Sequence, residues 1–272
     1  MPKVFLHLLP LRRRRLHVLQ FTALRNSLGI MTGVPDHPRI LYIHGRVSSK
    51  TTPKLQHLST RYHTHCVEYT PEQAQDYGWV VRQQAQAIRD FQPDVVVGSS
   101  YGGSVAITLC QRGYDALTAK SGDDGGKRAA RVLVAGRRNS VLESDKNAEL
   151  VGWVGPTILL AQAHVRKFGA LDDAHREANV WWPAEVPADM FHGTKDDVIP
   201  VEDTKLLAHS LKSKIKLRIK SPVMGFIEFK ELPGEEHRLE SLASGDQLFQ
   251  AVARVTERWE HGRSLIPEPV SP

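Results

Sequence analysis

Two kinds of apolar pattern alternate along this chain. Short runs rich in valine, leucine and isoleucine predict buried strands at Arg39–Gly45, Cys66–Tyr69 and Pro93–Gly98. The intervening and following segments have helical spacing, which predicts helices at Lys54–His63, 70–91 and 102–111. The second of these helices has N-cap and capping-box chemistry at Thr70 and Gln73. Strands that alternate with helices predict right-handed crossovers and a largely parallel sheet.

The same alternation continues in the second half. Strands are predicted at Ala188–Gly193 and Phe226–Leu232, with a helix from Glu202 to Leu211 between them. A closing helix carries four apolar side chains on one face, Leu248, Val252, Val255 and Trp259. Two further runs, Arg131–Gly136 and Pro156–Ala163, both have strand character, and periodicity does not choose between them. The Gly-rich run Ser121–Arg128 predicts a flexible loop.

Composition narrows the protein class. Of 272 residues, 41% are hydrophobic and 24% are charged, which is typical of a globular chain and excludes a disordered or fibrous one. No run of about 18 apolar residues occurs, so the sequence predicts no stable membrane insertion. Two cysteines are too few for a disulfide framework and fit a reducing compartment.

The net charge of +6 comes from the N-terminal segment. Six cations precede the first acidic residue, Asp36, and the remainder has 30 basic and 30 acidic residues. A nucleic-acid partner is therefore not expected of the body. Residues 1–35 form a basic extension that resembles an organelle transit peptide, although Ser27 is the single serine of its first 30 residues. The expected location is cytoplasmic or mitochondrial, the alternative being a dispensable extension with Met31 as the working start.

A candidate nucleophile follows the third predicted strand. Gly98-Ser99-Ser100-Tyr101-Gly102 is a G-x-S-x-G sequence between an apolar strand and a helix. A sharp strand-to-helix turn lifts its central serine above the sheet, and a β-carbon on either flanking glycine would collide with the turn. Ser100 is therefore the candidate nucleophile, while Ser99 is off the frame and has a structural role. A Gly-rich phosphate or packing turn is the alternative.

A serine hydroxyl needs a histidine base and a carboxylate that orients the histidine. Asp196 lies in the loop after the strand Ala188–Gly193, where parallel sheets place functional groups, and is the candidate acid. Its neighbour Asp197 is expected to be a loop or capping carboxylate. His237 follows the strand Phe226–Leu232 and is the candidate base. Three other histidines are expected on the surface, His164, His209 and His261.

Two backbone N–H groups are expected to face the developing oxyanion. One belongs to Tyr101, the residue after the nucleophile, and the second to Arg46, in the loop after the first strand. His44 is expected to pack under that loop. The Arg46 side chain is a candidate for favouring anionic substrates at the mouth.

His63-Thr64-His65-Cys66 is a possible metal site. His63 and His65 would share a face of an extended segment, but no second cluster with ligand spacing accompanies them. The favoured interpretation is a polar strand entry, with no metal.

At these residues the chain resembles serine hydrolases of the α/β-hydrolase superfamily, and most closely their compact branch of YqiA-like esterases. YIHGRVSS, DVVVGSSYGGSVAITL, GPTILLAQAH, HGTKDDVIPVEDT and GEEHRLESL resemble successive blocks of that branch. The resemblance implies ester hydrolysis through Ser100, Asp196 and His237. It also favours Pro156–Ala163 as the core strand and makes residues 114–150 an insertion.

The expected architecture is a three-layer α/β/α sandwich over residues 36–261, with a mostly parallel sheet of about six strands. A short cap at 165–187 and a flexible tail at 262–272 complete it. Such a cap encloses little volume and suits small to medium substrates. Trp181 and Trp182 either line the substrate site or pack the cap onto the sheet, and the sequence leaves both open.

The leading hypothesis is a serine hydrolase that cleaves carboxylic esters or thioesters through an acyl-enzyme, with no metal or cofactor. Its partner would be a small-molecule ester, and its oligomeric state stays open. The alternative is a catalytically silent binding or scaffold protein on the same fold. A third hypothesis, binding of nucleic acid or a membrane surface, depends on Arg12–Arg15 and predicts that a chain beginning at Met31 loses binding.

Overall fold

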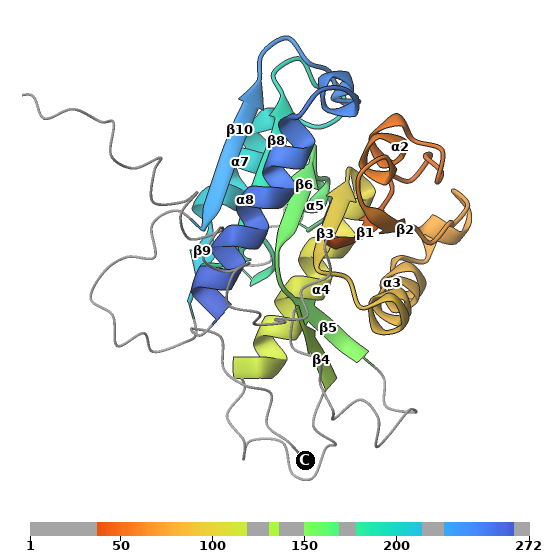
Figure 1. Ribbon diagram of the computed structural model, residues 1–272. Coiled ribbons are helices and arrows are strands. Elements are labelled where there is room, and N and C mark those ends of the chain that lie inside the picture. The colour runs from red at the N-terminus through yellow and green to blue at the C-terminus, as the bar shows by residue number, and fades with distance from the viewer. Residues whose placement is uncertain (1–36, 119–130, 136–149, 169–177, 214–225, 264–272) are drawn as a thin grey trace, which may run out of the picture. The chain divides into compact units, whose positions relative to one another are not determined.

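A six-stranded parallel sheet lies at the centre of the part of the chain that the computed structural model describes, which is residues 37–118, 131–135, 150–168, 178–213 and 226–263 (Figure 1). The strand order is β10-β8-β6-β3-β1-β2. The strands are β1 Arg39–Ile43, β2 His63–His65, β3 Val95–Ser99, β6 Thr157–Leu160, β8 Ala188–Gly193 and β10 Ile227–Leu232. Every pairing in this sheet is parallel, which confirms the predicted largely parallel sheet.

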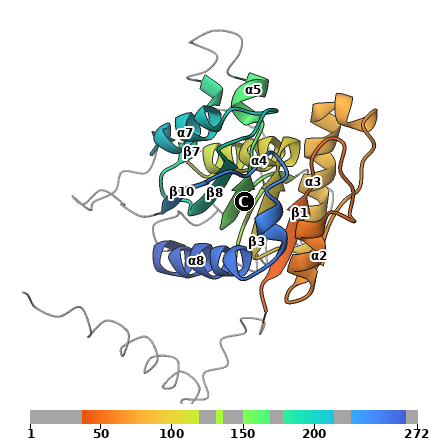
Figure 2. The ribbon, with the colours of Figure 1, turned by 90° about the horizontal axis from the view of Figure 1, so that it is seen from above.

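Helices cover both faces of the sheet, as the view onto the carboxyl ends of the strands shows (Figure 2). The helices α2 (Pro53–Ser59) and α8 (Gln247–Gly262) pack on one face. On the other face lie α3 (Tyr77–Phe91), α4 (Tyr101–Thr118), α5 (His164–Phe168) and α7 (Val201–His209). The three-layer α/β/α sandwich is therefore confirmed.

The layers follow from strands that are apolar on both sides. In β1, Ile40 and Tyr42 face the layer of α2 and α8, whereas Leu41 and Ile43 face the layer of α3 and α4. All four side chains are buried. A strand covered on both faces must be a continuous hydrophobic run, and this is the pattern by which the sequence predicted it.

Near the edge of the sheet, one strand and one helix begin at other residues than the sequence pattern predicted. The predicted strand Cys66–Tyr69 is wrong, because the residues that pair with β1 are His63–His65. The capping box at Thr70 does form, with the Thr70 N–H 2.8 Å from Gln73 Oε1, but it opens a short 3₁₀ turn. The helix α3 itself begins at Tyr77, where the Asp76 side chain accepts a hydrogen bond from the Trp79 N–H.

Both of the undecided runs form strands. The second run supplies β6 of the main sheet, as the resemblance implied. The first supplies β4 (Arg131–Val134), which pairs in parallel with β5 (Leu150–Val154) in a separate two-stranded sheet. The strand β5 was not predicted, and it packs against α4, which continues to Thr118 rather than ending near Gln111. A third small sheet joins β7 (Trp182–Pro183) to β9 (Leu211–Lys212).

Several predictions concern residues outside the described part of the chain. They are the basic extension at 1–35, the loop Ser121–Arg128, the cap residues 169–177 and the tail from 264 onward. Among the described helices, none is both long enough and apolar enough to cross a membrane.

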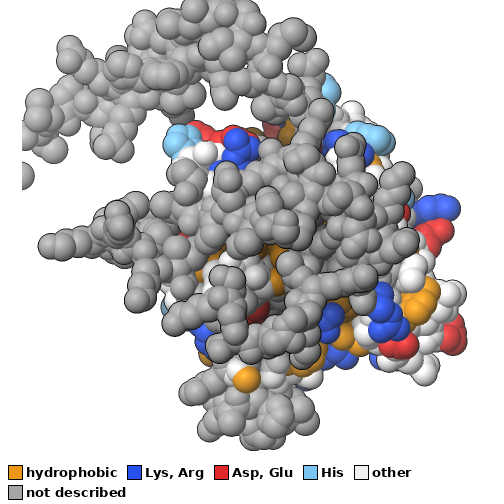
Figure 3. All heavy atoms as spheres, turned by 90° about the horizontal axis from the view of Figure 1, so that it is seen from below, with side chains coloured by type: hydrophobic (Ala, Val, Ile, Leu, Met, Phe, Trp, Pro, Cys, Tyr) orange, Lys and Arg blue, Asp and Glu red, His pale blue; other side chains and the backbone are white. Residues whose placement is uncertain are grey.

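Charges of both signs lie on the described surface. On the face seen from below, Lys and Arg side chains of described residues lie beside Asp and Glu side chains (Figure 3). This mixture agrees with the balance of 30 basic and 30 acidic residues that the sequence has from Asp36 onward.

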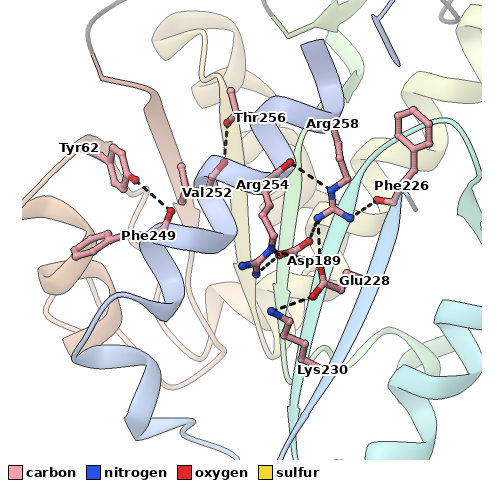
Figure 4. A network of polar contacts seen from close by, with 10 residues as sticks. All are labelled: Tyr62, Asp189, Phe226, Glu228, Lys230, Phe249, Val252, Arg254, Thr256 and Arg258. Atoms are coloured by element: carbon pink, nitrogen blue, oxygen red, sulfur yellow. Dashed lines mark hydrogen bonds and ion pairs between the residues drawn. The ribbon is translucent and has the colours of Figure 1, made fainter. Parts of the chain in front are cut away.

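A buried carboxylate fastens α8 to the sheet (Figure 4). Asp189, on β8, is 1% exposed, and its Oδ2 accepts hydrogen bonds from Arg254 Nε at 3.1 Å and Nη2 at 2.7 Å. Its Oδ1 accepts a hydrogen bond from Arg258, which also donates to the carbonyl oxygen of Phe226 at 3.1 Å. Glu228, on β10, adds a more exposed carboxylate beside both arginines. The cluster therefore ties α8 to β8 and β10.

We expect Asp189→Ala to lower the free energy of unfolding by about 3 kcal/mol, because it leaves two half-buried guanidinium groups without their shared partner. Glu228→Ala is the matched control, and since Glu228 is partly exposed it should cost about 1 kcal/mol or less. Urea denaturation at constant m-value measures both. Equal losses for the two variants would show that α8 is held by its apolar face alone.

Candidate active site

Ser100 lies at a sharp turn between β3 and α4 and has a left-handed backbone conformation, with φ of +54°. Two glycines make this turn feasible. A β-carbon on Gly98 would lie 2.7 Å from the Gly102 carbonyl oxygen, and one on Gly102 would lie 2.0 Å from the carbonyl oxygen of Ile43. The sequence predicted that both positions require glycine. They do so because the turn closely approaches its own backbone and the end of β1.

The turn is fixed by hydrogen bonds to neighbouring elements. The Ser100 N–H donates to the carbonyl oxygen of Leu160, at the end of β6, at 2.8 Å. The Ser100 carbonyl oxygen accepts from the N–H of Ala163 at 3.1 Å, immediately before α5. The strained backbone is therefore held by the segment that joins β6 to α5, and the side chain is left partly exposed.

His237 joins Ser100 to Asp196. It follows β10, and its Nε2 lies 2.9 Å from Ser100 Oγ. Its Nδ1 lies 2.7 Å from Asp196 Oδ2. The three residues come from loops after β3, β8 and β10, which meet at the carboxyl edge of the sheet. This is the order and geometry of a serine–histidine–aspartate relay.

Asp196, rather than its neighbour, makes these contacts. Its side chain is fully buried, and its Oδ1 accepts hydrogen bonds from the N–H groups of Val198 and Ile199 at 2.9 and 2.8 Å. Asp197 is exposed. The backbone donors fix the orientation of the carboxylate, so that its second oxygen faces His237.

The acid and base loops are joined to each other. The Lys195 N–H donates to the carbonyl oxygen of Glu235 at 2.9 Å, and the Gly234 N–H donates to Thr194 Oγ1 at 2.9 Å. A β-carbon on Gly193 would lie 2.2 Å from the Glu235 carbonyl oxygen, so the two loops can approach this closely only with glycine there. Asp196 and His237 are therefore positioned as one unit.

His192 contacts the candidate acid, although its sequence pattern predicted no role for it. It is fully buried on β8, and its Nε2 lies 3.0 Å from Asp196 Oδ2 and 2.8 Å from the Ile199 carbonyl oxygen. Its Nδ1 lies 2.7 Å from the Thr204 hydroxyl. His192 thus lies against the same carboxylate oxygen, Oδ2, that faces His237. The sequence feature that could have indicated this contact is the position of His192 near the end of β8, four residues before Asp196.

The geometry after β1 favours the predicted oxyanion donor. The Gly45 carbonyl oxygen is 2.7 Å from His44 Nδ1 and accepts from the Ser48 N–H at 3.1 Å. The Arg46 N–H belongs to the same peptide group as the Gly45 carbonyl. In a trans peptide these two groups point in opposite directions, so the Arg46 N–H points away from the His44 ring and the Ser48 N–H. A β-carbon on Gly45 would lie 3.5 Å from Ser100 Cβ, which brings this peptide beside the nucleophile.

The other predicted donor, the Tyr101 N–H, is at the first position of α4, where helical N–H groups have no intrahelical acceptor. His44 itself is buried and stacks on Tyr69 with 3.9 Å between ring centroids. Burial lowers the pKa of His44, so the neutral imidazole packs under the loop as predicted.

The predicted substrate-binding tryptophans lie in the core. Trp181 is 4% exposed and Trp182 is fully buried, and their indole N–H groups donate to the carbonyl oxygens of Ala178 and Val186. Trp181 packs on Tyr114, far along α4 from Ser100. Of the two interpretations that the sequence left open, packing onto the sheet is therefore the one that the contacts favour.

The expectation that His164 lies on the surface is wrong. It is 1% exposed, with Nδ1 3.3 Å from Ser104 Oγ and Nε2 2.9 Å from the Asn179 carbonyl oxygen. Burial lowers the pKa of His164 to about 4 and keeps the ring neutral. His209 and His261 are exposed, as predicted.

The possible metal site at His63 and His65 has no third ligand among the described residues. These residues contain no group of three or more His, Cys, Asp or Glu that could hold a metal ion. His63 and His65 instead lie against the ring of Phe91, each with 5.2 Å between ring centroids. A nearby hollow of about 510 Å³ between α2 and β2, lined in part by Leu55 and Cys66, contains none of the candidate catalytic residues.

The sequence matches a known protein family. The model of the alpha/beta hydrolase family matches residues 5–256. The chain belongs to the alpha/beta hydrolase family. No curated protein matches this hydrolase. Its place in the compact YqiA-like branch stays a prediction.

Three solved structures are similar to this hydrolase at low identity. The esterase domain of a Rhodothermus marinus protein is 15% identical over 81% of this chain and 88% of that chain, with a TM-score of 0.44. A thermophilic esterase from Thermogutta terrifontis is 17% identical over 83% and 82%, with a TM-score of 0.46. Mouse alpha/beta hydrolase domain-containing protein 10 is 13% identical over 81% and 90%, with a TM-score of 0.46.

The helix α2 holds the loop that carries His237. Lys54 Nζ donates a hydrogen bond to the carbonyl oxygen of Arg238, the residue after His237. One turn later, His57 Nε2 lies 2.7 Å from the Gly245 carbonyl oxygen, and its ring stacks on Phe249 at 4.3 Å. Burial lowers the pKa of Lys54 to about 8. Since α2 directly follows the loop of Arg46, it links that loop to the base loop.

Because Lys54 positions His237, we expect Lys54→Met to slow the reaction of Ser100 with a fluorophosphonate about tenfold. Lys54→Arg, which restores a donor, should recover most of this rate. Gln56→Met changes an exposed residue of the same helix and is the control. Labelling time courses at saturating and subsaturating probe give the measurement. A rate for Lys54→Met equal to that of the control would remove Lys54 from the positioning of the base.

Proposed function

We propose that this alpha/beta hydrolase is a serine hydrolase that cleaves carboxylic esters or thioesters of small to medium acyl groups. The observation that carries the proposal is the continuous relay from Ser100 Oγ through His237 to Asp196, with contacts of 2.9 and 2.7 Å. Such a chain supplies a nucleophile, a base in reach of its proton and a carboxylate that sets the tautomer of the base.

The proposed reaction has two steps. Ser100 Oγ attacks the carbonyl carbon while His237 Nε2 takes the hydroxyl proton, and the oxyanion is bound by the N–H groups of Tyr101 and Arg46. The imidazolium then gives its proton to the leaving alcohol or thiol, and the acyl group remains on Ser100. Water attacks the acyl-enzyme with His237 again as base, which releases the acid and restores the serine. Asp196 holds the Nδ1 proton of His237 throughout.

The decisive experiment compares Ser100→Ala with Ser99→Ala, its off-frame neighbour, for labelling by a fluorophosphonate probe and hydrolysis of 4-nitrophenyl butyrate. We expect Ser100→Ala to abolish labelling and to lower kcat by about 10⁴-fold or more, because it removes the nucleophile. Ser99→Ala should retain both activities. The same assay with His237→Ala and Asp196→Asn tests the relay.

Circular dichroism and thermal melts establish that each variant is folded. A folded wild-type protein that neither reacts with the probe nor hydrolyses the ester would reject the proposal and favour the catalytically silent alternative. Labelling that persists in Ser100→Ala would assign the nucleophile elsewhere.

A further inference from the structure

Two cations flank the candidate nucleophile. Arg46 follows Gly45, whose β-carbon position lies 3.5 Å from Ser100 Cβ. Lys167 is on α5, one turn after Ala163, whose N–H donates to the Ser100 carbonyl oxygen at 3.1 Å. The first residue therefore lies on the loop after β1 that adjoins Ser100, and the second on the helix whose preceding residue contacts Ser100.

Neither cation is paired with an acidic side chain in the described part of the chain, although their sequence neighbours are. Lys50 lies 3.1 Å from Glu68, and Arg166 lies 3.6 Å from Asp203. The acidic side chain that raises the pKa of Tyr101 is Asp76. Asp76 caps α3 and lies 3.9 Å from Arg82, so it already has a cationic partner. Within the described residues, Arg46 and Lys167 are therefore left to interact with a ligand.

Aromatic rings hold Lys167 in place. Its Nζ lies 4.1 Å from the ring centroid of Tyr77 and 5.6 Å from that of Phe168. Tyr77 in turn packs edge-on against Tyr101, with 5.6 Å between centroids, and Tyr101 directly follows the nucleophile. Cation–π contacts of this kind fix an ammonium group while leaving its outward side free for an anion.

The two cations and Tyr101 also influence one another electrostatically. Burial lowers the pKa of Lys167, and the positive charge of Arg46 lowers it further. The same Arg46 charge opposes the rise that burial causes in the pKa of Tyr101. Both side chains are exposed, so an anion can reach them, and a bound anion would relieve the repulsion between the two like charges.

We propose that the site of this hydrolase takes esters whose acyl or alcohol part carries a carboxylate, bound by Arg46 and Lys167. The inference rests on the proposed function and specifies its substrate class. The aromatic rings of Tyr77, Tyr101 and Phe168 provide apolar contact beside the anion-binding cations. A preferred substrate therefore combines a short apolar stretch with a negative charge.

The first experiment compares kcat/KM for matched pairs of esters. Mono-4-nitrophenyl adipate is paired with 4-nitrophenyl hexanoate, and 5-butyryloxy-2-nitrobenzoate with 4-nitrophenyl butyrate. We expect at least one anionic ester to exceed its neutral match by about fivefold or more. Raising the salt concentration from about 0.02 M to about 0.5 M should reduce this ratio, because exposed charge–charge attraction is screened.

Variants assign the preference to the two cations. Lys167→Met and Arg46→Gln should each lower the anionic-to-neutral ratio about threefold or more, and the double variant should abolish it. Lys167→Glu should instead favour a matched ester with a trimethylammonium group. Lys50→Gln removes a cation from the same loop as Arg46, but one already paired with Glu68, and should leave the ratio unchanged.

Two outcomes separate the inference from the proposed function. Hydrolysis of neutral esters through Ser100 with no preference for either anionic ester would overturn the inference and leave the proposed function intact. If no ester is hydrolysed, calorimetry on Ser100→Ala compares adipic acid monoamide with hexanamide. Tighter binding of the anionic amide that Lys167→Met removes would support the anion site, and equal binding would overturn it.

Discussion

The close approach of Gly102 to the end of β1 is the constraint on which the site depends. With its β-carbon position 2.0 Å from the Ile43 carbonyl oxygen, any side chain there would push α4 away from the sheet. The turn at Ser100 would then lose its contact with the loop that begins at His44. The nucleophile and the candidate oxyanion donor of Arg46 are therefore neighbours because one residue has no side chain.

Much of this arrangement follows from local sequence and the geometry of a parallel sheet. Ser100, Asp196 and His237 each directly follow an apolar strand, and parallel strands end at the same edge, so their convergence could be predicted without knowing any contact. The choice between Asp196 and Asp197 also followed from position in the loop. The buried central strands were predicted because both of their faces are apolar.

The remainder depends on tertiary contacts that no local pattern encodes. The edge strand β2 consists of polar residues that pair with β1, so its composition resembles a loop. His164 lies on a short helix whose burial depends on Ser104 and Asn179, which come from elsewhere in the chain. Trp181 and Trp182 were ambiguous because an apolar side chain can line a cavity or fill it, and only the fold distinguishes the two.

Charged side chains have different partners in the core and at the candidate active site. In the core, Asp189 is buried against Arg254 and Arg258, and the pairing fastens a helix. At the site, the carboxylate of Asp196 accepts two backbone hydrogen bonds that set its direction. Arg46 and Lys167 have no acidic partner within the described part of the chain, so their charges can interact with a ligand that reaches Ser100.

The length of α4 places its two ends far apart. A helix of 18 residues spans about 27 Å, so Thr118 lies that far along its axis from the residue after the nucleophile. A substitution at the Thr118 end of α4 can therefore influence Ser100 only through the helix itself and through the elements that pack along it.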